Sequence, residues 1–173
     1  SEKVQKRDDT GWDISHARRL VHALDALERN SAALKNVFSL KDVQLPSSVL
    51  TKGFANTLIA VVWNGDKENP LFSNYFSGAN GWFRVGYDGG SGFSAGTPPY
   101  GMTDSFLAGG YVTWSKYSPI IGSLGRRFYD LTNSAKGDND RFMDTYYKQF
   151  SKGASAKSKN INKFMFYPSL VGI

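Results

Sequence analysis

The chain has 173 residues and a net charge of +6, and it is 40% hydrophobic and 21% charged. These values are ordinary for a single folded domain, and they exclude an intrinsically disordered chain. Cysteine is absent, which excludes disulfides, thiolate catalysis and cysteine-ligated metal sites.

The longest clear apolar run, Leu58 to Trp63, is much shorter than the ~18 residues of a membrane-spanning helix, so no membrane span is predicted. The chain opens with a polar segment, residues 1–9, which we interpret as an N-terminal arm. We expect either that a targeting peptide has been removed or that residues 1–173 belong to a larger protein. The positive charge favours anionic partners, although it also serves solubility.

Two helices are predicted in the first third of the chain. Apolar residues recur at three- and four-residue spacing between Thr10 and Asn30, which predicts one helix with a buried face. Thr10 resembles its N-cap, with Asp13 as the partner in a capping box, and Asn30 its end. A second helix is predicted from Pro46 to Asn64–Gly65. Its later half is apolar on nearly all sides, which predicts a position at the centre of the domain.

Three more helices are predicted in the second half. One begins at Thr103 or Asp104 and is closed by Pro119. Its Gly109–Gly110 pair is best tolerated where another part of the chain packs closely. The next helix begins at Pro119, and the last follows the acidic residues of 138–140. Strand signals are limited to residues 81–88 and 164–173.

These elements predict a mainly α fold of packed antiparallel helical hairpins, with at most two short strands, in a single domain of residues 1–173. We expect a helical core at 10–151, a linker rich in Lys and Ser at 152–163, and an extended C-terminal segment at 164–173. The lysines between 148 and 163 lack interleaved aromatic residues apart from Phe150, so a solvated linker is favoured over a nucleic-acid surface.

The connection from Gly65 to Met102 is unusually long and rich in glycine and aromatic residues. Long loops in compact domains are usually functional or disordered. So many aromatic side chains would not remain in water without a use, so we expect an ordered loop that packs over the helix ends. These side chains are Phe72, Tyr75, Phe76, Trp82, Phe83, Tyr87, Phe93 and Tyr100.

Familiar catalytic motifs are weak in this sequence. Gly92 to Gly96 matches G-x-S-x-G, but two prolines follow at once, and the histidines, His16 and His22, lie far upstream. The glycine spacing does not fit a dinucleotide fingerprint, and the two histidines do not share a helix face. We therefore expect no cofactor and no metal, and a capping contact between His16 and Asp13.

The strongest functional signal is the set of polar and flat aromatic side chains in this loop. A sugar ring stacks its C–H face on an aromatic ring and offers hydroxyls to polar groups, and an arginine suits an acidic substituent. The predicted ligand-binding residues are Asn80, Trp82, Arg84, Tyr87 and Tyr100. The alternative is a loop that its aromatic residues merely anchor to the helices.

Asp88 and Asp104 are the candidate catalytic carboxylates. Two carboxylates roughly 5–10 Å apart could hydrolyse a glycosidic bond. Asp88 could instead close an Asp-Gly turn, and Asp104 could instead be a helix N-cap.

The leading hypothesis is therefore an extracytoplasmic domain, secreted or periplasmic, that binds a glycan or polysaccharide. It would be a carbohydrate-active enzyme if these carboxylates cleave the glycan. In architecture alone, helix, long aromatic loop and helix resembles the α/α toroid enzymes that act on polysaccharides. The alternative hypothesis is a non-enzymatic helical interaction or assembly module of a larger secreted protein. A cytoplasmic location and the oligomeric state stay open.

Overall fold

The computed structural model describes residues 11–78, 102–133, 138–151 and 166–171. Within these ranges the protein is mainly helical, which confirms the mainly α part of the predicted fold class, and no β-strand is present. Two isolated antiparallel bridges, Asp13–Tyr75 and Trp63–Phe72, are the nearest approach to a sheet there. The predicted strand at 81–88 and the linker at 152–163 lie outside the described residues.

The first helix, α1 (Ile14–Arg29), follows the predicted apolar spacing and ends at Asn30 as expected. Its N-cap is Asp13, not Thr10, because the Asp13 side chain itself accepts hydrogen bonds from the amides of Ser15 and His16. The chain then enters a second helix, α2 (Ser31–Phe38), which the sequence analysis missed. α2 ends at Ser39, whose φ of 53° is left-handed.

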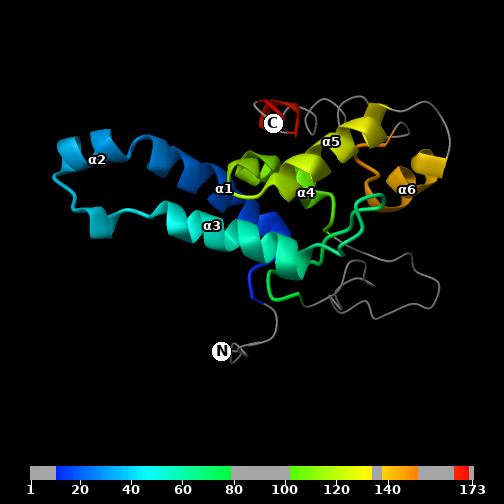
Figure 1. Cartoon of the computed structure of the whole chain (residues 1–173), viewed down its shortest axis with the longest axis horizontal. Coiled ribbons are helices and arrows are strands. Elements are labelled where there is room, and N and C mark those ends of the chain that lie inside the picture. Colours follow the sequence, from blue (N-terminus) through cyan, green and yellow to red (C-terminus); the bar gives the residue numbers. More distant parts are fainter. Residues whose placement is uncertain (1–10, 79–101, 134–137, 152–165, 172–173) are drawn as a thin grey trace, which may run out of the picture.

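A short 3₁₀ turn, η1 (Asp42–Gln44), leads into α3 (Ser48–Thr57), which continues as a π-helical turn, η2 (Leu58–Val62). The prediction of a central position is right for one face only, because Leu58 and Val62 are buried whereas Val61 is exposed. Residues 31–52, here called the arm, project away from the packed body with the chain reversing at their far end (Figure 1).

The predicted helix after Asp104 is divided into α4 (Ser105–Ala108) and a 3₁₀ helix, η3 (Tyr111–Lys116). The division falls at Gly110, whose φ is +70°. A Cβ at Gly110 would lie 2.8 Å from Cε1 of His22, and one at Gly109 would lie 2.7 Å from Cβ of Arg18. The glycine pair therefore allows the chain to turn tightly against α1.

α5 (Pro119–Asn133) and α6 (Asp138–Tyr146) form as predicted. The C-terminal segment differs from the prediction, because residues 166–169 form a helical turn and not an extended strand. Phe166 on this turn is fully buried. Pro168 is tolerated in this helical turn because the first residues of a helix have no intrahelical partner for their amide groups, so the missing N–H of proline costs no hydrogen bond.

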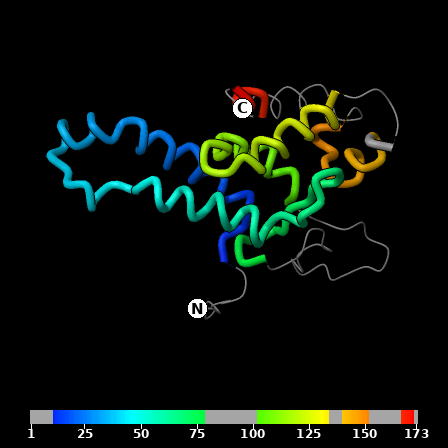
Figure 2. Tube along the Cα trace, viewed as in Figure 1, coloured from blue at the N-terminus to red at the C-terminus, as the bar shows by residue number. Residues whose placement is uncertain are grey.

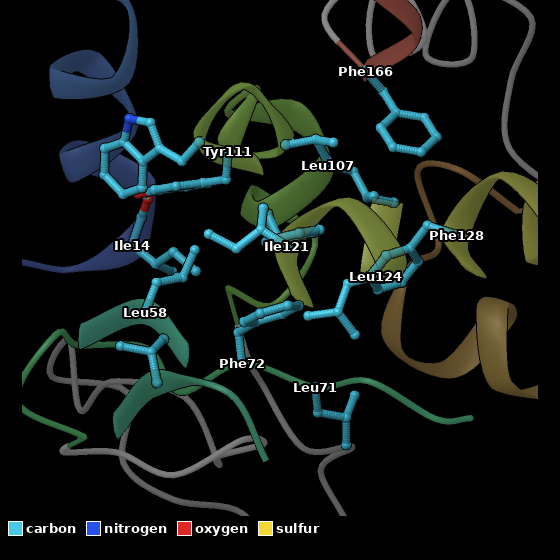
Figure 3. Close-up of a cluster of buried hydrophobic side chains, with 14 of the residues drawn as sticks. Ile14, Leu58, Leu71, Phe72, Leu107, Tyr111, Ile121, Leu124, Phe128 and Phe166 are labelled. Atoms are coloured by element: carbon cyan, nitrogen blue, oxygen red, sulfur yellow. Dashed lines mark hydrogen bonds between the residues drawn. The ribbon is translucent and has the colours of Figure 1, made fainter. Parts of the chain in front are cut away.

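One apolar core joins these elements (Figure 3). Phe72, from the irregular stretch after Gly65, stacks on Phe106 of α4 with ring centroids 4.3 Å apart. The aromatic residues Phe72 and Phe76 are buried, so in the described first part of the 65–102 connection they anchor the chain and do not face solvent. The side chains labelled in Figure 3 come from α1, η2, residues 71–72, α4, η3, α5 and the C-terminal turn.

Candidate functional site

The two ends of segment 79–101 are fastened at one place on the body. The amide of Gly78 donates to the carbonyl of Tyr75 at 2.9 Å, and the amide of Met102 donates to Oδ1 of Asn74 at 2.7 Å. The chain therefore leaves and returns beside residues 74–75, whatever path it takes between. The Nδ2 nitrogen of Asn74 is buried and has no hydrogen-bond partner among the described residues.

The start of α1 lies against this same place. The amide of Ile14 donates to the carbonyl of Asn74 at 2.8 Å, and the amide of Phe76 donates to the carbonyl of Trp12 at 2.9 Å. Trp12 itself is 57% exposed. An exposed indole, with an apolar face and a polar N–H group, thus stands beside the point where segment 79–101 departs.

Asp13 uses both of its carboxylate oxygens. Oδ1 accepts from the amides of Ser15 (3.0 Å) and His16 (2.8 Å), and Oδ2 lies 2.6 Å from Nδ1 of His16. Burial raises the pKa of Asp13, but the hydrogen bonds from His16 and Ser15 together outweigh it and hold that pKa below its usual value. This confirms the predicted capping contact and makes Asp13 a structural carboxylate.

Asp104 has the opposite environment. It occupies the N-cap position of α4 with α-helical dihedral angles, and its side chain makes no capping hydrogen bond. It is half-buried. Burial raises the pKa of Asp104, and the positive charge of Arg18 on α1 opposes that rise without cancelling it. A carboxyl group with a raised pKa beside a cation is typical of functional sites, although ion-pair networks also produce it.

The buried Tyr111 lies close enough to Asp13 and Arg18 for both charges to affect it. Its hydroxyl donates to the carbonyl of Ile14 at 2.6 Å. Burial raises the pKa of Tyr111, as does the charge of Asp13, whereas Arg18 lowers it. Arg18 therefore acts on both Tyr111 and Asp104. Trp12 and Asp13 pair with residues 75–76, Asp104 follows Met102, and His16 and Arg18 act on Asp13 and Asp104. We call these five residues the root cluster.

A buried polar chain holds Thr103, next to Asp104, in place. The amide of Phe72 donates to Oγ1 of Thr103 at 2.9 Å, Thr103 bonds to the Tyr147 hydroxyl at 2.9 Å, and that hydroxyl donates to the carbonyl of Pro70 at 2.5 Å. Burial raises the pKa of Tyr147, so it stays protonated as this chain requires. Tyr147, directly after α6, thus helps to hold Thr103 and, through the chain, its neighbour Asp104.

The predicted site residues are only partly placed. Asp104 lies in the root cluster, and the capping role considered for it is not fulfilled by its side chain. The other predicted residues, Asn80, Trp82, Arg84, Tyr87, Asp88 and Tyr100, lie outside the described residues. The sequence analysis missed Trp12 and Arg18, whose importance depends on contacts with residues about sixty to ninety positions away.

A second feature is an open hollow of about 490 Å³ at the end of α5. It is lined by Tyr129, Asn133, Tyr167, Leu170 and Val171. The Nδ2 group of Asn133 already donates to the carbonyl of Tyr129 at 2.7 Å, so the hollow offers mainly apolar and aromatic surface.

Comparisons with protein families, with curated proteins and with solved structures give no match. Within the described ranges no group of three His, Cys, Asp or Glu side chains could hold a metal ion. The properties of the root cluster therefore follow from the burial, charges and hydrogen bonds of its own residues.

Proposed function

We propose that this protein is an extracytoplasmic domain that binds a glycan through segment 79–101 and the root cluster. The observation that carries the proposal is the fastening of both ends of that segment beside the exposed Trp12. Segment 79–101 supplies Trp82, Tyr87 and Tyr100 by sequence. Aromatic side chains from two distant parts of the chain would then meet one ligand, a usual arrangement for sugar stacking.

The polar residues favour an acidic glycan. Arg18 is exposed on α1 beside the half-buried Asp104, and segment 79–101 adds Arg84 by sequence. A guanidinium group binds a carboxylate or sulfate through two parallel hydrogen bonds. The net charge of +6 acts in the same direction over longer distances.

Cleavage of the bound glycan would use Asp104 as the acid. Its raised pKa favours a protonated carboxyl that can protonate a glycosidic oxygen. Asp13 is unsuited to the partner role because its two oxygens are already engaged by Ser15 and His16. Asp88 therefore remains the proposed second carboxylate, as base or nucleophile.

Binding is tested on an array of neutral and uronic-acid oligosaccharides. Trp12→Ala, Trp82→Ala and Tyr100→Ala should each weaken binding about tenfold, because each removes a stacking ring. Tyr129→Ala is the matched control, since Tyr129 is an exposed aromatic residue on α5, outside the root cluster. Equal binding by all four variants and the unaltered protein would contradict the proposal.

Cleavage is tested separately by the release of reducing ends from any glycan that binds. Asp104→Asn and Asp88→Asn should abolish release while binding persists. If the unaltered protein binds but releases nothing, the protein is a binding domain and the enzymatic part of the proposal is wrong.

A further inference from the structure

The arm exposes most of its large apolar side chains. α2 buries none of its residues, and Val43 on η1 is 87% exposed. The other exposed large side chains of the arm are Val37, Phe38, Val49 and Leu50. Figure 2 shows the arm as the blue-to-cyan end of the tube, beyond α1 and away from α4, α5 and α6. An eight-residue helix without buried contacts is only marginally stable in water.

These apolar residues gather where the chain reverses. Val37 and Phe38 stand in the last turn of α2, Val43 in η1, and Val49 and Leu50 in the first turn of α3. Apolar side chains at the end of a projecting segment can insert into a neighbouring apolar environment while the packed part of the domain stays outside it. The same residues spread over a flat face would need a much larger complementary surface.

The charges of the arm are mostly positive. Residues 31–52 contain Lys35, Lys41 and Lys52 and one acidic residue, Asp42. Asp42 forms an ion pair with Lys35, while Lys41 and Lys52 are exposed and form no salt bridge within the described chain. Two copies of the arm would bring like charges together, which disfavours self-association through it.

We propose that the arm docks on an anionic lipid bilayer. The apolar end, Val37, Phe38 and Val43, would enter the boundary between headgroups and acyl chains, about 5–10 Å deep for an interfacial helix. Lys41 and Lys52 would lie near lipid phosphates. An apolar end with adjacent lysines that form no salt bridge in the described part of the chain fits a charged membrane surface better than a neutral one.

In this proposal the arm contacts the surface of the bilayer and does not cross the membrane. By length and composition, Asp42–Val62 is one helical stretch in the described chain that could cross a membrane, with 22% of its most apolar window buried. However, Ala55, Leu58 and Val62 in its second half belong to the core and are fully buried. Crossing would remove them from the core, whereas docking by the arm leaves them in place.

The test is flotation of the protein with lipid vesicles. Vesicles of phosphatidylcholine with about one quarter phosphatidylglycerol should carry the protein upward, and binding should fall as salt is added. Pure phosphatidylcholine vesicles should bind it more weakly. Lys41→Glu and Lys52→Glu should each weaken binding at least about fivefold, from the contribution of one basic residue near an anionic surface.

Val43→Ser is the apolar variant, and Val171→Ser is its matched control. Val171 is 85% exposed, almost the same as Val43, but lies on the C-terminal turn. We expect weaker flotation for Val43→Ser and none of that loss for Val171→Ser. Because both side chains are in water, both variants should keep the circular dichroism spectrum and thermal midpoint of the unaltered protein.

Three outcomes would overturn the proposal. One is that the unaltered protein does not float with the anionic vesicles. Another is that Val43→Ser and Val171→Ser float equally. The third is that light scattering shows a dimer that Val43→Ser dissociates, which would assign the arm to contact with a second copy.

Discussion

Oδ1 of Asn74 accepts a hydrogen bond of 2.7 Å from the amide of Met102, and this bond joins two points 28 residues apart. It closes the chain around segment 79–101. Asn74 also receives the start of α1, through the bond from the Ile14 amide to its carbonyl. One buried asparagine therefore links three parts of the chain.

Replacing Asn74 with alanine should destabilise the protein. The variant leaves the amide of Met102 without its buried acceptor, which typically costs about 1–3 kcal/mol. Urea unfolding measures this loss. Asn56→Ala is the control, because Asn56 is exposed on α3, and it should change the stability by less than about 0.5 kcal/mol. Equal losses in the two variants would show that Asn74 has no special role.

The decrease in the free energy of unfolding at acidic pH should depend on Asp13. Its pKa is lower in the folded protein than in the unfolded chain, so its contribution is present above about pH 4 and is lost as the pH falls through the folded pKa. Asp13→Asn keeps an N-cap acceptor but cannot titrate. We expect the variant to lose part of the decrease in unfolding free energy below about pH 4. If Asp13→Asn shows the same decrease in unfolding free energy below about pH 4 as the unaltered protein, other carboxylates cause that decrease.

Arg18→Ala should raise the pKa of Asp104 further, because the guanidinium charge is what opposes the effect of burial. Carboxyl carbon chemical shifts followed by NMR against pH would report this directly. Arg19→Ala is the matched control, since Arg19 is an exposed neighbour on the same helix that does not contribute to the pKa of Asp104. A pKa of Asp104 that Arg18→Ala leaves unchanged would contradict this account of the root cluster.

The raised pKa of Asp104 also has a stability consequence of opposite sign to that of Asp13. Its ionisation is harder in the folded protein, so stability is greatest below the unfolded pKa and declines as the pH rises through the folded pKa. Asp104→Asn should therefore be more stable than the unaltered protein at neutral pH. Urea titrations at several pH values measure it, and a variant less stable at neutral pH would refute the assignment.

Two glycines should respond to alanine with opposite signs. Gly53 lies inside α3 with no atom within 4 Å of an added Cβ, so Gly53→Ala should stabilise the protein by about 0.5–1 kcal/mol. Gly110 has a φ of +70°, and its added Cβ would meet His22 at 2.8 Å. Gly110→Ala should destabilise it by about 1–2 kcal/mol. Thermal unfolding of the two variants measures both changes in stability. If both variants shift the thermal midpoint in the same direction, the proposed roles of Gly53 and Gly110 are wrong.

The helices that the sequence predicts best are those with the clearest local pattern. α1 and α5 have a regular apolar spacing, and Pro119 marks the start of α5. The missed helix, α2, carries apolar residues that are not buried. The predicted C-terminal strand was wrong because residues 166–169 form a helical turn that buries Phe166, and a short apolar run does not distinguish a strand from a helical turn.

The candidate site was predicted less completely than the fold. Asp104 is a candidate by sequence because an acidic residue at a helix start is visible locally, but its raised pKa depends on burial and on Arg18, 86 positions earlier in the chain. Trp12 carried no local sign of its place beside residues 74–78. The residues of segment 79–101 remain predictions from their composition alone.

By itself, the sequence determined the helical fold class, the end of α1 at Asn30, the start of α5 at Pro119, and the absence of cysteine chemistry, because each depends on composition or on residues within a few turns of one another. The tertiary structure decided the closure at Asn74, the break at Gly110, the charge beside Asp104 and the exposure of the arm. These depend on which distant segments pack together, and the burial and electric field at one residue are set by neighbours that its own local sequence does not contain.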